Sequence, residues 1–136
     1  EASLEDLTIQ MMGATNSRGL KINVMPRSLI VPKEQWFEAN RILKSTLQSG
    51  TANNDINVLK ATNSMPEGIK LNHYLTDTDA WFIRSNVQNG MKCFNRVANV
   101  FSDDNDFDTE NLKYKGYERY SFGWSDFRAL YGSPGA

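Results

Sequence analysis

The chain has 136 residues, a hydrophobic content of 40% and a formal net charge of −1 from 15 basic and 16 acidic side chains. This size and composition suit one domain with a buried core. Tight nucleic-acid binding needs clustered Lys and Arg, whereas here basic and acidic residues are interleaved, so we expect no dedicated DNA- or RNA-binding protein. The single cysteine excludes an intrachain disulfide and a cysteine-rich zinc site.

The N-terminal segment predicts one helix followed by two strands. Residues 3–19 are predicted as a helix because Ser3 suits an N-cap and Gly19 suits a C-terminal stop. Its apolar stripe comprises Leu4, Leu7, Met11 and Met12. The alternating residues 20–24 predict a half-buried strand, and the short apolar run 29–31 predicts a fully buried one.

A second helix is predicted from Pro32 to about Gly50. Proline is favoured as the first residue of a helix, and Glu34 lies where the helix dipole is positive. Apolar residues then recur at helical spacing, namely Trp36, Ala39, Leu43 and Leu47.

The middle of the chain predicts short strands joined by turns. We expect a strand at 56–61, a turn at 65–68 and a strand fragment at 69–71. A turn at 77–79 then leads to an apolar strand at 80–83.

The last third predicts two long strands, 91–101 and 110–124, separated by the acidic loop SDDNDFD (102–108). Helices and strands together predict a mixed α+β fold with mainly antiparallel pairing. We find no internal repeat and no long linker.

The sequence offers little support for a catalytic or metal site. His73 is the only histidine, and no nucleophile motif accompanies it, so we expect no enzyme, no catalytic residues and no cofactor. Asp104, Asp106 and Asp108 are spaced like calcium-loop ligands, but Thr109 and Lys115 replace the required glycine and glutamate. We therefore favour a solvated connection over a metal site.

Aromatic residues gather at the C-terminal end of the chain. Because residues two apart on a strand share a face, one face is predicted to carry Leu112, Tyr114, Gly116, Glu118, Tyr120, Phe122 and Trp124. The opposite face would carry Tyr117, Arg119, Ser121 and Gly123. We expect Tyr120, Phe122 and Trp124 to cover the core, while other rings and arginines meet a neighbouring molecule. A platform that stacks sugars or bases is the alternative.

Three blocks follow one another along the chain: LKINVMPRSLIVPKEQWFEANRILKS (20–45), LTDTDAWFI (75–83) and ENLKYKGYERYSFGWSDFRALYGSPGA (110–136). The most specific parts are RYSFGWSD and YGSPGA in the last block. In these blocks the chain resembles the major capsid proteins of tailed bacteriophages. The resemblance covers nearly the whole chain.

This resemblance implies the Hong Kong 97-type capsid fold. Residues 1–90 would form an axial-type domain, 91–122 the strands of a peripheral-type domain, and 123–136 a return to the axial domain. The N-terminal arm, extended loop and spine helix of the family have no counterpart here, so we expect this chain to be the C-terminal part of a subunit.

The resemblance also implies a function and partners. The chain would be a structural subunit of an icosahedral phage head around double-stranded DNA, located in the virion and assembled in the host cytoplasm. Its partners would be other copies in pentamers and hexamers, scaffolding, portal or decoration proteins, and DNA through weak non-specific contacts. The candidate core or subunit-interface residues are Trp36, Trp81, Tyr117, Arg119, Tyr120, Phe122, Trp124, Phe127, Arg128 and Tyr131.

Overall fold

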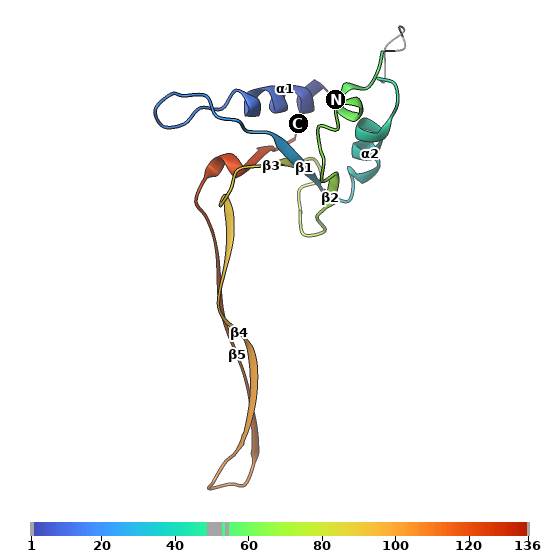
Figure 1. Ribbon diagram of the computed structural model, residues 1–136. Helices are drawn as coiled ribbons and strands as arrows, with labels where there is room; N and C mark the ends of the chain where they lie inside the picture. The colour runs from blue at the N-terminus through green and yellow to red at the C-terminus, as the bar shows by residue number, and fades with distance from the viewer. Residues whose placement is uncertain (1, 49–52, 54, 136) are drawn as a thin grey trace. The chain divides into compact units, whose positions relative to one another are not determined.

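The computed structural model describes residues 2–48, 53 and 55–135. The chain divides into two compact units, one formed by residues 1–88 with 127–136 and the other by residues 89–126. Helices and a mixed sheet occur in the first unit, and a single hairpin forms the second (Figure 1). The predicted mixed α+β class is confirmed. In the described part of the chain, no helix combines the length and apolarity needed to cross a bilayer.

A four-stranded sheet in the order β2–β1–β3–β6 forms the centre of the first unit. Its strands are β1 (Pro26–Val31), β2 (Ile69–Leu71), β3 (Trp81–Ser85) and β6 (Leu130–Ser133). β1 runs parallel to β2 and antiparallel to β3, which is antiparallel to β6. The parallel pair requires a crossover, which residues 32–68 provide.

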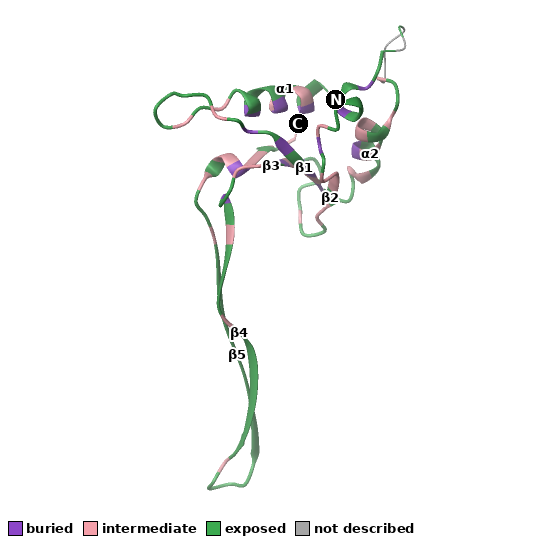
Figure 2. Ribbon diagram, in the orientation of Figure 1, coloured by how far each residue is buried: buried purple, intermediate pink, exposed green. Residues whose placement is uncertain are grey.

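Three helices accompany this sheet: α1 (Ala2–Met12), α2 (Trp36–Lys44) and α3 (Val58–Ala61). Each contributes to one hydrophobic core, whose buried members are Leu4, Met11, Val24, Leu29, Val31, Ala39, Leu59, Met65 and Ile83. Figure 2 shows buried positions on β1, on β3 and along one side of α1. The apolar stripe predicted for α1 is therefore used as expected at Leu4 and Met11.

The segment after α1 differs from the prediction. The helix ends at Met12 rather than near Gly19 because the Asn16 side chain organises a loop, in which its Oδ1 accepts from the backbone N–H groups of Arg18 and Leu20 at 2.8 and 3.0 Å. Such local side-chain bonds compete with helix formation. The predicted strand 20–24 is also wrong, since only an isolated bridge between Thr15 and Lys21 forms there.

The strand predicted at 29–31 is confirmed, but the helix after it is shorter than expected. Pro32 is buried directly after β1, and α2 begins four residues later at Trp36. The helix ends at Lys44, so Leu47 lies beyond it and forms an isolated bridge with Ile56. The expected stop at Gly50 lies outside the described residues.

The predicted strand 56–61 is wrong, because this segment forms the short helix α3. Asn57 is its N-cap and accepts from the backbone N–H of Lys60 at 3.4 Å. The turn at 65–68 is confirmed by a hydrogen bond from Gly68 N–H to the Met65 carbonyl of 2.8 Å. The strands predicted at 69–71 and 80–83 correspond to β2 and β3.

The second unit is an antiparallel hairpin of β4 (Met91–Asn105) and β5 (Leu112–Trp124). β4 contains two irregularities, between Asn95 and Val97 and between Val97 and Val100. Both place an extra residue on β4, which accounts for its 15 residues against 13 in β5. The two long strands are confirmed. The acidic segment is only partly a loop, since β4 continues through Asn105.

Candidate assembly surfaces

Three of the candidate residues support the core of the first unit. Trp36, Trp81 and Tyr131 are half-buried and pack against the buried cluster. Trp81 and Tyr131 lie on neighbouring strands, β3 and β6, and Tyr131 pairs with the fully buried Ile83. These three rings therefore act mainly as cover for the core rather than as a free surface.

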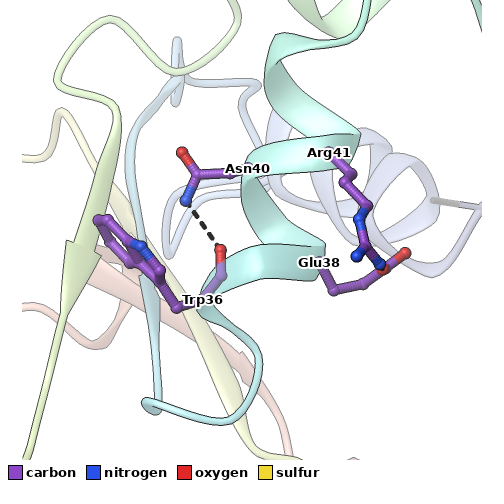
Figure 3. A network of polar contacts seen from close by, with 4 residues as sticks. All are labelled: Trp36, Glu38, Asn40 and Arg41. Atoms are coloured by element: carbon purple, nitrogen blue, oxygen red, sulfur yellow. Dashed lines mark hydrogen bonds and ion pairs between the residues drawn. The ribbon is translucent and has the colours of Figure 1, made fainter.

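The first turns of α2 carry two polar contacts that point to different sides of the helix (Figure 3). Asn40 donates from Nδ2 to the Trp36 carbonyl at 2.8 Å, on the side where the Trp36 indole lies. On another side, Arg41 donates to Glu38 at 3.1 Å. Both partners of this ion pair are well exposed, so it marks the solvent side of α2 and contributes little to stability.

Phe127 and Arg128 lie in the 3₁₀ helix η1 (Phe127–Ala129), which belongs to the first unit. The Arg128 guanidinium carbon lies 4.6 Å from the centre of the Phe127 ring, as in a cation–π contact. The backbone carbonyl of Arg128 accepts a 2.7 Å hydrogen bond from Ser85 Oγ. Phe127 itself is 67% exposed, which makes it an accessible ring.

The hairpin has two chemically different faces. Because β5 is free of bulges, its residues alternate regularly, and each paired residue of β4 shares the side of its partner. We name one side the apolar face, with Met91, Cys93, Asn95, Phe101, Asp103, Asn105, Leu112, Tyr114, Gly116, Glu118, Tyr120, Phe122 and Trp124. The other is the basic face, with Lys92, Phe94, Val97, Val100, Ser102, Asp104, Lys113, Lys115, Tyr117, Arg119, Ser121 and Gly123. The alternation predicted for 112–124 is confirmed.

The prediction that Tyr120, Phe122 and Trp124 cover the core is wrong. Their exposed fractions are 56%, 74% and 71%. Tyr120 and Phe122 contact one another edge to face, with ring centres 5.5 Å apart, but no second layer covers them in the part of the chain that the structure describes. Alternation shows that rings share a face; it does not show that anything covers that face.

Rings also lie over glycines across the hairpin. A Cβ atom at Gly116 would lie 3.2 Å from the Phe101 ring, and one at Gly123 would lie 3.7 Å from the Phe94 ring. Phe101 pairs with Gly116, while Phe94 lies two residues along β4 from Lys92, the partner of Gly123. A ring packed on a glycine is a common means of stabilising a strand pair. It leaves the outer surface of both rings exposed.

The turn between β4 and β5 is organised by Asp106. Its carboxylate accepts from Lys113 Nζ at 2.7 Å and from Thr109 Oγ1 at 3.0 Å, and these two contacts lower the pKa of Asp106, the Lys113 contact having the larger effect. In the strand register, the backbone of Asp104 lies opposite that of Lys113. Across the described residues, no three His, Cys, Asp or Glu side chains are placed to hold a metal.

A groove of about 770 Å³ opens in the first unit between α1, β1 and α3. Its apolar lining includes Ile9, Met12, Met25 and Val58, all of which are exposed, while Glu5 and Arg27 are its charged members. His73 does not line it; that residue lies exposed in the turn after β2. The groove therefore lacks the paired titratable groups expected at a general acid–base site.

Sequence reasoning missed two residues that matter to these surfaces. Phe107 is 97% exposed in the hairpin turn, although its position among acidic residues suggested only a solvated loop. Asn57 is 98% shielded from solvent, being 2% exposed, and bridges α2 to α3 by donating to the Ile42 carbonyl and to Ser45 Oγ. The sequence signal for Asn57 is its position just before an apolar segment, which is typical of an N-cap.

The sequence profile of a family described as "Phage capsid protein" matches residues 2–133. A search of curated protein sequences gave no match. Among solved structures, the chain is similar to one titled "Crystal structure of virus-like particle from Pyrococcus furiosus", with a TM-score of 0.51 and 12% sequence identity. The similarity covers 96% of this chain and 49% of the other, so this chain spans about half the length of that neighbour. The family match extends over nearly the whole chain, and the chain therefore belongs to the phage capsid protein family.

Proposed function

We propose that this chain is a structural subunit of an icosahedral phage head, which assembles with other copies into a shell around double-stranded DNA. The observation that carries the proposal is the hairpin, whose many large apolar side chains remain exposed on both faces. Isolated two-stranded hairpins are at best marginally stable in water. A neighbouring surface that covers the rings would supply the missing burial.

We further propose the Hong Kong 97-type arrangement for the two units. Residues 1–90 would then belong to the axial-type domain and 91–122 to the peripheral-type domain. The division of the chain at residues 88 and 126 supports this assignment. The pairing of Gly123 and Trp124 with β4 favours a return that begins at Phe127 rather than at residue 123.

A shell subunit acts by association and not by turnover, so we assign it no catalytic residue and no cofactor. Each subunit would contact its neighbours head to tail around pentamers and hexamers, which are heterologous contacts. Scaffolding, portal or decoration proteins and weak contacts with the packaged DNA complete the proposed partners. The proposed location is the virion, with assembly in the host cytoplasm.

Negative-stain microscopy tests this proposal most directly. The complete polypeptide carrying this chain is expressed and purified, and we expect closed icosahedral particles. Uniformly dispersed subunits over the full concentration range, under conditions where they are folded by circular dichroism, would contradict the proposal.

The alternative is a module that binds carbohydrate or nucleic acid through its exposed rings. The rings of the apolar face and the Lys and Arg side chains of the basic face favour this candidate, since stacking and positive charge support both kinds of binding. Titration with oligosaccharides and with single-stranded oligonucleotides separates the two functions. Saturable binding that is lost in Phe122→Ala, together with an absence of particles, would support the module.

A further inference from the structure

The two faces of the hairpin carry mainly opposite unpaired charges. On the apolar face these are Asp103 and Glu118, and on the basic face they are Lys92, Lys115 and Arg119 together with one acid, Asp104. Within the described residues none of these six side chains forms an ion pair, whereas Lys113 is already bonded to Asp106. Adjacent residues of a strand point to opposite sides. Glu118 and Arg119 therefore cannot neutralise each other within one hairpin.

The charges on the two faces also have the same spacing along the hairpin. Asp103 lies opposite Tyr114, four residues before Glu118 on β5, and Lys115 lies four residues before Arg119. At about 3.4 Å per residue, four residues span about 14 Å along the hairpin. The two patterns differ by one residue, so a shift of one residue brings Glu118 to the level of Arg119 on the same strand, and Asp103 on β4 to the level of Lys115 on the adjacent strand β5.

The same shift aligns apolar side chains. On the apolar face of one copy, Phe101 pairs with Gly116. After the shift, Phe101 lies opposite the pair Val100 and Tyr117 on the basic face of the other copy. Likewise, Tyr120 of the first copy lies opposite the pair Phe94 and Ser121 of the other copy. Two sheets that pack face to face lie about 10 Å apart and interdigitate such side chains.

We propose that the apolar face of this hairpin binds the basic face of the hairpin in a second copy of the chain, with the two hairpins parallel and offset by one residue. Glu118 then lies opposite Arg119, and Asp103 lies opposite Ser102, within reach of the long side chain of Lys115 on the adjacent strand. The contact joins two different surfaces and is therefore heterologous, as closure around a ring requires. Identical hairpins have the same twist, so they can nest along their length. This inference rests on the proposed function, because it names the surface through which copies associate.

Charge reversal tests the pairing in the complete polypeptide carrying this chain. One variant reverses the apolar face (Asp103→Lys with Glu118→Lys), a second reverses the basic face (Lys115→Glu with Arg119→Glu), and a third combines all four changes. Each of the first two places like charges opposite one another, and we expect the assembled fraction in sedimentation to fall about tenfold or more. The combined variant restores opposite charges, so its assembled fraction should return towards that of the unchanged protein.

A matched control reverses two acids in the hairpin turn (Asp108→Lys with Glu110→Lys), which belong to neither face, and should assemble normally. Loss of assembly in both face variants without recovery in the combined variant would overturn the pairing and leave the proposed function standing. Normal assembly of both face variants would likewise overturn the pairing and leave the proposed function standing. If the unchanged protein never associates, the proposed function and the pairing fail together.

The natural Cys93 gives a second measurement that does not depend on a folded variant. It is the only cysteine of the chain and lies exposed on the apolar face. We expect a maleimide to label it rapidly in dispersed subunits and at least about tenfold more slowly after assembly, since burial blocks access to the thiol. Lys44→Cys in a Cys93→Ser background is the control and should label at similar rates in both states. Equal rates for Cys93 in both states, or protection already in dispersed subunits, would overturn the inference.

Discussion

The two units of this chain use apolar residues in opposite ways. In the first unit, Met11 and Ile83 are fully buried and Val24 is 1% exposed, with helices covering the sheet. In the second unit, Gly90 is the only buried residue among those described, although both strands are longer than any in the first unit. The first unit contains its own stabilising core. The second is organised locally by strand pairing and leaves its large apolar side chains exposed.

This difference separates two requirements that are usually met together in a small protein. Hydrogen bonding along β4 and β5 fixes the register and the faces of the hairpin. Stability, however, comes mainly from apolar area removed from water, at roughly 25 cal/mol per Å². The hairpin has a fixed register but little buried apolar area. This is the state expected for a surface that is covered when subunits associate.

The largest expected contrast comes from removing one apolar side chain in each unit. Ile83→Ala opens a cavity beneath the sheet and should lower the free energy of unfolding by about 2–5 kcal/mol. Phe122→Ala removes a ring that is 74% exposed, and its effect should stay within about 0.5 kcal/mol in dispersed subunits. Guanidinium unfolding followed by circular dichroism measures both. Equal losses in the two variants would show that the hairpin rings are buried in the subunit.

Two glycines sharpen the same comparison through steric contact. A Cβ atom at Gly132 would lie 2.4 Å from the Phe82 ring on the neighbouring strand, whereas one at Gly123 would lie 3.7 Å from Phe94. Gly132→Ala should therefore cost about 1–3 kcal/mol through overpacking, and Gly123→Ala should be close to neutral. Thermal melts compare the two variants. Adding Phe82→Ala should reduce the additional cost of Gly132→Ala, and purely additive losses would argue against the clash.

Asn57 tests a set of polar contacts in the first unit. Its side chain donates to the Ile42 carbonyl and to Ser45 Oγ and also caps α3. Asn57→Ala removes a buried side chain and leaves these half-buried partners unpaired, so it should cost about 1–3 kcal/mol. Asn57→Asp keeps the capping oxygen but lacks the amide donor, so it should not restore stability. A fully stable Asp variant in urea unfolding would show that capping alone matters.

The smallest effect is expected at Asp106 in the hairpin turn. Its pKa lies below the ordinary value of 3.8, mainly because Lys113 bonds to it and secondly because Thr109 does. For a lowered pKa, the stabilising contribution is present above the unfolded value and is lost as the pH falls through the folded value. An NMR titration of the carboxylate should give a midpoint below 3.8. In Lys113→Gln the midpoint should rise, and an unchanged midpoint would mean that Lys113 is not the main cause.

The sequence predicted those elements whose signal is periodic and local. β5 was predicted because large apolar residues recur at even spacing, namely Leu112, Tyr114, Tyr120, Phe122 and Trp124, with Gly116 and Glu118 between them. β1 was predicted because its apolar run has the length of a buried strand. The short strand β2 was predicted from the turn before it. The phage capsid resemblance was carried by three blocks in a fixed order, above all by RYSFGWSD and YGSPGA in the last block.

Other features depend on contacts that no local pattern contains. Residues 20–24 alternate like a strand but find no partner strand, because the Asn16 loop intervenes. The exposure of Trp124 depends on whether another layer covers the apolar face. The alternation of residues does not predict such a layer. The bulges of β4 follow from its pairing with β5, and nothing in the residues 95–100 alone marks them.

The location of both bulges in β4 has a consequence for how this hairpin tolerates variation. Every ring of β5 keeps its side because the irregularities are confined to the partner strand. Deleting one residue between Asn95 and Val100 would remove a bulge and straighten the ribbon locally, while a deletion in β5 would invert the ring pattern from that point onward. Insertions and deletions in related sequences should thus accumulate in β4, where they change the curvature of the hairpin. They should be avoided in β5, where they would move the rings of the apolar face to the basic face.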